Sequence, residues 1–154
     1  MIAEIISIGD ELLIGQTINT NSSWIAEQLN LLGIRVLQIT TISDNKQHIL
    51  SSLESARKNA DIVLVTGGLG PTKDDITKPT NCEYFDSKLI INQDVLKDVE
   101  NIILPRVGRI NELNAKQAEV PDNAIVIRNP IGTAPILWFE KENTVFIFMP
   151  GVPF

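Results

Sequence analysis

The sequence predicts an α/β fold, a three-layer α/β/α sandwich with a mostly parallel sheet. Short apolar segments alternate with longer segments whose apolar residues recur every three to four positions. The resulting order of strand, helix, strand, helix and strand is typical of a parallel sheet with helices on both faces. With 154 residues, the chain is long enough to bury a substantial core within one domain.

The first half of the chain gives the clearest elements. Residues 2–8, 35–41 and 61–66 are short and rich in apolar side chains, as strands covered on both faces should be. Residues 22–32 and 46–59 carry an apolar stripe at helical spacing, which predicts two helices between the strands.

The second half is less regular. Helices are predicted over residues 75–85, 92–106 and 111–119. Pro79 must lie in the first turn of the first helix or break it, and Pro105 marks the end of the second. The predicted strands are 124–128, 136–139 and 145–149, and the last two are joined by a hairpin turn at 140–143.

The bulk composition excludes several partner classes. The net charge of −6 disfavours non-specific binding to nucleic acid, because phosphate contacts need lysine and arginine. No apolar stretch approaches the ~20 residues of a membrane span, and no basic segment precedes the first strand. Cys82 is the only cysteine, so no disulfide can form within the chain. We therefore expect a cytoplasmic protein that binds neither nucleic acid nor membrane.

The segment Val65–Thr77 is the most informative part of the sequence. Gly67, Gly68 and Gly70 follow an apolar strand, and glycine lets backbone N–H groups approach an anion closely. Two adjacent carboxylates then begin the predicted helix, and such carboxylates can bind a hard cation such as Mg²⁺. The pattern indicates a site for a nucleotide or a phosphorylated cofactor. The simpler alternative is a strand-to-helix turn in which Asp74 or Asp75 caps the helix.

Acidic residues follow three predicted strands in succession. Asp10 and Glu11 come after the first strand, Asp44 after the second, and the aspartate pair after the third. Strand ends in a parallel sheet meet at one edge, so these carboxylates are expected to converge on a divalent cation. Alternatives remain open: Asp44 with Gln47 also fits a capping box, and Asp10 and Glu11 also fit solvated loop charges.

Five motifs in order resemble one family. The segment Thr66–Thr77 resembles the signature of the CinA N-terminal domain, which lies within the wider MoaB/Mog (molybdopterin-binding) fold family. The other four matching motifs are a first loop made of residues 8–15 and 19–22, then residues 114–118 with Pro121, residues 129–135 and residues 149–153. The resemblance therefore spans nearly the whole chain.

The resemblance implies a metal-dependent pyrophosphatase that cleaves ADP-ribose, a nucleotide substrate, into AMP and ribose 5-phosphate. It implies Asp75 and Asp44 as catalytic residues and a divalent cation, Mg²⁺ for preference, as cofactor. The implied metal ligands are Asp10, Glu11, Asp44, Asp74 and Asp75. The implied substrate-binding residues are Gly67, Gly68, Gly70, Pro71, Thr72, Thr77, Asn19, Asn21, Lys116, Asn129, Gly132, Thr133 and Pro135.

Two positions depart from the patterns of related families. Ile136 stands where the family usually has glycine, which puts close backbone approach in doubt there. Asp74 stands where molybdopterin adenylyltransferases usually carry arginine. For Lys116 a solvated side chain is the equal alternative, and the Asn129–Pro135 segment also fits a plain turn.

Two other functions stay open beside the pyrophosphatase. The domain could bind or adenylylate molybdopterin, or it could bind a nucleotide in a regulatory, non-catalytic role. The resemblance also implies self-association into a homo-oligomer. We expect residues 1–154 to be the N-terminal part of a longer CinA protein, without the amidase activity of the C-terminal domain.

Overall fold

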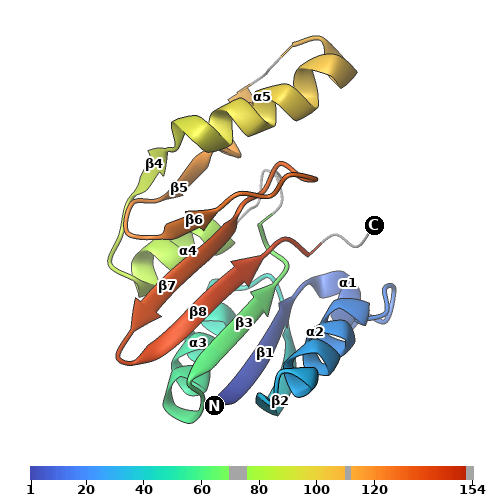
Figure 1. The fold of residues 1–154 in the computed structure, drawn as a ribbon, viewed down its shortest axis with the longest axis vertical. Helices are drawn as coiled ribbons and strands as arrows, with labels where there is room; N and C mark the ends of the chain where they lie inside the picture. Colours follow the sequence, from blue (N-terminus) through green and yellow to red (C-terminus); the bar gives the residue numbers. More distant parts are fainter. Residues whose placement is uncertain (70–75, 110–111, 152–154) are drawn as a thin grey trace.

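The computed structural model describes residues 1–69, 76–109 and 112–151. A six-stranded sheet forms the centre, with the strand order β2-β1-β3-β8-β7-β6 (Figure 1). Its strands are β1 (Ile2–Ile8), β2 (Arg35–Ile42), β3 (Ile62–Thr66), β6 (Ile125–Ile127), β7 (Ile136–Lys141) and β8 (Thr144–Met149). The helices α1 (Asp10–Leu13) and α2 (Thr20–Leu31) connect β1 to β2, α3 (Lys46–Asn59) connects β2 to β3, and α4 (Thr77–Tyr84) follows β3.

Helices cover both faces of this sheet. Ala3 and Ile5 of β1 pack against Ile25 and Leu29 of α2 in one buried cluster. The alternate β1 residues, Ile6 and Ile8, join a second and larger cluster with Ile49 and Leu53 of α3. Because alternate residues of a strand point to opposite faces, β1 is buried on both sides. The predicted three-layer fold is confirmed.

The sheet is parallel over four strands and antiparallel at one side. Strands β2, β1, β3 and β8 run in the same direction, and β7 and β6 each pair antiparallel with their neighbour. The turn from β7 to β8 has positive φ angles at Glu142 and Asn143, 47° and 67°. Two such residues form the turn type that fits the twist of a hairpin, so the predicted hairpin is confirmed.

A smaller unit with two strands lies beside the main sheet. The strands β4 (Leu89–Ile91) and β5 (Glu119–Pro121) pair antiparallel, and α5 (Gln93–Val107) and α6 (Glu112–Lys116) lie between them in sequence. Val95 and Val99 of α5 form a buried cluster with Ala118. The prediction of one helix over 111–119 is wrong at its C-terminal end, where β5 begins. Strands of three residues are too short for alternation to reveal them.

The predicted end of α5 at Pro105 is also wrong. The helix continues to Val107 and ends at Gly108, whose φ of 74° is left-handed. Pro105 has no N–H to donate to the Asn101 carbonyl, but in the last turn this removes only one intrahelical bond. The first residue of α2 is Thr20, two positions before the predicted start, because the Asn19 side chain caps the helix by accepting from the Ser22 N–H.

Aromatic packing fixes the position of α4. Phe85, directly after this helix, stacks on Phe139 of β7 with ring centroids 4.0 Å apart, and it meets Phe146 of β8 edge-on. Such aromatic pairs contribute about 0.5–1.5 kcal/mol each beyond the burial of their area. These contacts hold the C-terminal end of α4 against β7 and β8. None of the helices that the structure describes is both long and apolar enough to cross a membrane.

Candidate functional site

The candidate site lies where the parallel strands end. Ser7 of β1 pairs with Thr66 of β3, and Thr66 pairs in turn with Met149 of β8. These strands therefore end at one level, with Gly9 and Gly67 following directly. Ligands of open α/β sheets bind beyond such carboxyl ends.

The glycines after these strands allow backbone segments to touch. Gly67 has a φ of 99°, and a Cβ there would lie 2.1 Å from the Ile8 carbonyl oxygen. A Cβ on Gly151 would lie 2.5 Å from the Gly67 Cα. A Cβ on Gly68, whose φ is 71°, would lie 2.2 Å from Thr77 Oγ1. Packing within the protein therefore requires these glycines, whether or not an anion also approaches them.

The remainder of the predicted phosphate-binding segment, Gly70, Pro71 and Thr72, lies outside the described residues. So do Asp74 and Asp75. Their predicted roles in substrate and metal binding stay predictions.

Asp10 and Asp44 are brought together from two neighbouring strand ends. The backbone N–H of Asp10 donates to Asp44 Oδ2 at 3.2 Å, and the N–H of Asp44 donates to Asp10 Oδ1 at 3.3 Å. The capping alternative for Asp44 is wrong. Asn45 caps α3 instead, because its side-chain oxygen accepts from the N–H groups of Gln47 and His48. The Asp44 carboxylate is thereby left at the strand edge.

The pKa of Asp44 is raised at this edge of the sheet. Burial is the main cause, the N–H of Asp10 opposes it, and the negative charges of Asp10 and Glu11 add to it. Glu11 itself lies close to Gly9, where a Cβ would be 2.5 Å from its Oε1. Carboxylate oxygens are suitable ligands for Mg²⁺, so the chemistry of Asp10 and Asp44 fits a divalent cation. The described residues contain no cluster of three or more metal-ligand side chains.

Asn19 and Asn21 tie the strand ends together. The amide of Asn19 donates to Ser7 Oγ at 2.9 Å and to Thr41 Oγ1 at 3.4 Å. The amide of Asn21 donates to the Gly151 carbonyl at 2.9 Å and to Thr66 Oγ1 at 3.3 Å. Both amide nitrogens are used within the protein, so these residues shape the site, and the prediction that they contact substrate stays untested.

The start of α4 carries a buried lysine, Lys78, that was not among the predicted site residues. Thr77 is fully buried against Gly68, and Lys78 beside it is only 7% exposed. The Lys78 ammonium donates to the carbonyls of Lys116 and Gln117 at 3.4 and 3.3 Å. Lys78 thus joins α4 to the segment of the predicted phosphate contact Lys116, whose own side chain is exposed. In the sequence, only the polar residues at helical spacing on α4 could have indicated a role for Lys78.

The Asn129–Pro135 segment is braced by its own first residue. The Asn129 amide donates to the Ala134 carbonyl at 3.1 Å and accepts from the Ile131 N–H at 3.2 Å. A Cβ on Gly132 would lie 2.7 Å from that amide nitrogen. Asn129 therefore shapes the turn. Of the other predicted residues, Thr133 is half-buried and Pro135 is buried, while Ile136 opens β7 in register with Ile127.

The structure thus joins part of the predicted set directly. Hydrogen bonds join Asp10 to Asp44 and Asn21 to Thr66, the residue before Gly67, while Gly68 lies against Thr77. Within residues 1–69, 76–109 and 112–151, no hydrogen bond links the side chain of Lys116 or the Asn129–Pro135 segment to Gly67 or Gly68.

Comparison with known sequences gives the family. The family described as a probable molybdopterin binding domain matches residues 4–154. The CinA-like protein of Flavobacterium psychrophilum is 54% identical over 155 residues, which cover 100% of this chain and 37% of that protein. The CinA-like protein of Cytophaga hutchinsonii is 47% identical over 152 residues, which cover 99% of this chain and 36% of that protein. The chain therefore spans little more than a third of the length of these curated relatives.

Solved structures show the same relationship. The crystal structure of CinA from Thermoplasma acidophilum has a TM-score of 0.88 at 32% identity, covering 99% of this chain and 89% of that one. The molybdopterin biosynthesis enzyme MoaB from Thermus thermophilus has a TM-score of 0.63 at 16% identity, covering 99% of this chain and 82% of that one. At 16% identity, the similarity to MoaB shows only that the two chains share a fold. The chain belongs to the probable molybdopterin-binding domain family and, within it, to the CinA-like proteins.

Proposed function

We propose that this domain hydrolyses ADP-ribose to AMP and ribose 5-phosphate with the help of a divalent cation. One observation supports this most directly: Asp10 and Asp44 pair at the same sheet edge as Gly67 and Gly68. Oxygen ligands for a hard cation beside a segment without side-chain bulk suit a diphosphate group.

In this proposal, the glycine segment and the carboxylates have different roles. The backbone at Gly67 and Gly68 would bind the diphosphate, together with the predicted Gly70, Pro71 and Thr72. Asp10 and Asp44 would hold the cation, with the predicted ligands Glu11, Asp74 and Asp75. When bound, the cation withdraws charge from a phosphoryl oxygen and acidifies water.

The bond changes are those of phosphoryl transfer to water. A water oxygen bonds to one phosphorus while the bond from that phosphorus to the bridging oxygen breaks, so that each product keeps one phosphate. The proton of the attacking water would pass to solvent. Asp44, one of the two predicted catalytic residues, would act through the cation that it holds. The predicted catalytic Asp75 would act beside it.

The proposal is tested by incubating the protein with ADP-ribose and Mg²⁺ and separating the nucleotides by chromatography. AMP and ribose 5-phosphate are expected in equal amounts, and an excess of chelator should stop their formation. Absence of AMP with every divalent cation tried would reject the activity.

A second function is favoured by the family's description, which names molybdopterin binding, and by the fold shared with MoaB. Binding of a pterin, measured by quenching of pterin fluorescence, would support it. Tight binding of ADP-ribose without turnover would instead support the regulatory, non-catalytic role. Mg²⁺-dependent turnover separates the pyrophosphatase from both.

A further inference from the structure

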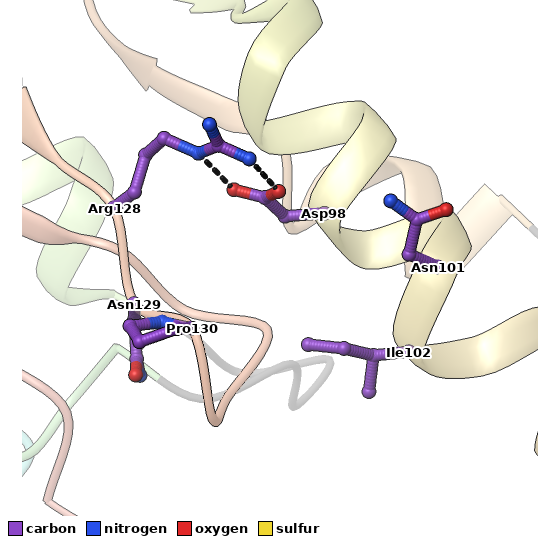
Figure 2. Close-up of a pocket in the computed structure, with 6 residues that line it drawn as sticks. All are labelled: Asp98, Asn101, Ile102, Arg128, Asn129 and Pro130. Atoms are coloured by element: carbon purple, nitrogen blue, oxygen red, sulfur yellow. Dashed lines mark hydrogen bonds and ion pairs between the residues drawn. The ribbon is translucent and has the colours of Figure 1, made fainter.

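A cavity of about 570 Å³ opens between α5 and the segment that leads into β7. Its volume lies within the range of small-molecule sites, roughly 300–1,000 Å³. Figure 2 shows Ile102 extending from α5 toward the segment that carries Pro130, with Asn101 and Asp98 one turn apart on the helix. The lining residues are Asp98, Asn101, Ile102, Arg128, Asn129 and Pro130.

The two walls of this cavity are held in place. Arg128 Nε donates to Asp98 Oδ2 at 2.7 Å, and a second guanidinium nitrogen donates to the other oxygen of the same carboxylate (Figure 2). The hydrogen bonds from Arg128 lower the pKa of Asp98, so the pair stays ionised at neutral pH. Val95 and Val99, which lie on the same helical stripe as Ile102, anchor α5 and are 2% and 0% exposed. The cavity is therefore built on ordered elements.

The cavity lies at the same edge of the sheet as Gly67 and Gly68. Leu137, near the start of β7, pairs with Phe148 of β8, and the next β8 residue, Met149, pairs with Thr66 of β3. The lining residues Arg128, Asn129 and Pro130 follow β6, which ends at this edge and lies three strand spacings from β3, a distance of roughly 14 Å. The carboxylate pair lies on the opposite side of β3. A diphosphate bound at Gly67 and Gly68 thus has the cation ligands on one side and the cavity on the other.

The chemistry of the lining suits a purine. Ile102 and Pro130 offer apolar surface from the two walls. The Asn129 amide is engaged within its own turn, whereas no hydrogen bond joins the Asn101 amide to any other residue that the structure describes. An asparagine amide matches the adjacent donor and acceptor of adenine, its N6 amino group and N7. Asn101 is therefore placed to read the base.

We propose that this cavity binds the adenosine half of the nucleotide, with Ile102 and Pro130 against the adenine ring and Asn101 on its edge. This assignment rests on the proposed pyrophosphatase function. It also gives the substrate a direction, since the ribose 5-phosphate half then points away from α5.

Titration calorimetry with the two products tests the assignment. Asn101→Ala should weaken AMP binding about tenfold, as the loss of a buried ligand hydrogen bond commonly does, and Ile102→Trp should weaken it further by filling the cavity. Neither change should alter binding of ribose 5-phosphate. Asn101→Ala should also remove any preference for AMP over inosine 5′-monophosphate, which has an oxo group in place of the amino group. Lys88→Ala, at an exposed residue just before β4 that does not line the cavity, is the control and should match the unmodified protein.

The outcomes separate this inference from the proposed function. Equal AMP affinity in the unmodified protein and both cavity variants would overturn the adenosine assignment, even if ADP-ribose is hydrolysed normally. Parallel losses for AMP and ribose 5-phosphate would also overturn it, because they would indicate a general disturbance. Cavity-dependent AMP binding without any ADP-ribose turnover would uphold the pocket and reject the pyrophosphatase.

Discussion

Asp10 and Asp44 each accept a hydrogen bond from the backbone N–H of the other, at 3.2 and 3.3 Å. This exchange locks the ends of β1 and β2 together and places two carboxylates side by side. The pKa of Asp44 is raised, first by burial and then by the charges of Asp10 and Glu11, so ionising Asp44 in this arrangement has a cost in free energy. A positive charge bound between the two carboxylates would offset that cost.

Asp44→Asn is expected to lower ADP-ribose turnover strongly. Metal-linked stabilisation of a transition state commonly contributes several kcal/mol, which corresponds to a loss on the order of a hundredfold or more. Steady-state rates over a Mg²⁺ titration measure the effect. Asp86→Asn is the matched control, because Asp86 is exposed and its φ of 53° is one that asparagine tolerates. Equal Mg²⁺ dependence in the two variants would remove Asp44 from the metal site.

The same substitution should leave stability intact or increase it. The raised pKa means that folding favours the protonated Asp44, so its favourable contribution is present below the unfolded pKa and is lost as pH rises through the folded pKa. At pH 7 the ionised side chain is therefore unfavourable, and asparagine removes its charge. Thermal midpoints at pH 4 and pH 7 measure this: Asp44→Asn should gain more relative to the unmodified protein at pH 7. A lower midpoint at pH 7 would contradict the electrostatic account.

Gly67→Ala should destabilise the fold far more than Gly33→Ala. Both glycines have positive φ, 99° and 73°, but a Cβ at Gly33 has no atom within 4 Å, whereas at Gly67 it would overlap the Ile8 carbonyl. Gly33→Ala is expected to cost about 1 kcal/mol of unfolding free energy from backbone strain alone. Gly67→Ala adds steric overlap that only movement of β1 or β3 can relieve. Urea unfolding measures both, and similar losses would show that the overlap is relieved easily.

Asn21→Ala should loosen the strand ends. It removes the hydrogen bonds to the Gly151 carbonyl and Thr66 Oγ1, and leaving partly buried partners unsatisfied costs about 1–3 kcal/mol. Asn30→Ala is the control, because Asn30 is exposed near the other end of the same helix. Urea unfolding should show a lower midpoint for Asn21→Ala only. If Asn21→Ala matches the control, these contacts do not stabilise the site.

Tyr84 should ionise only under strongly alkaline conditions. Its hydroxyl donates to Glu54 Oε2 at 3.2 Å, and burial followed by the negative charge of Glu54 raises its pKa to about 12. The chain has one tyrosine, so phenolate absorbance reports on this residue alone. Folding favours the protonated phenol, so its stabilising contribution holds below about 10 and is lost as pH rises toward 12. Glu54→Gln should lower the midpoint of the titration, and an unchanged midpoint would exclude the charge as a cause.

Much of the fold could be predicted because its main elements are long and patterned. The predicted helix 46–59 coincides with α3, and the predicted strand 2–8 coincides with β1. The strands β4 and β5 were missed because three residues give no usable period. The end of α5 was placed too early because a proline in the last turn disturbs only one hydrogen bond.

The candidate site was less accessible to sequence reasoning. The convergence of Asp10 and Asp44 follows from parallel strand order and could be predicted. The choice of Asn45 over Asp44 as the cap of α3 depends on the competing hydrogen bond from Asp10, which only the tertiary structure provides. The cavity beside Asn101 was missed for a similar reason: residues of α5 meet the segment before β7, which is distant in sequence.

The most direct measurement of the proposed activity is ³¹P NMR of ADP-ribose incubated with the protein and Mg²⁺, with and without both substitutions Asp10→Asn and Asp44→Asn. The account predicts that the diphosphate resonances give way to two phosphate monoester resonances with the unmodified protein, and that they persist with the doubly substituted protein under the same conditions. Diphosphate resonances that persist with the folded, unmodified protein, or equal rates of cleavage in both proteins, would contradict it.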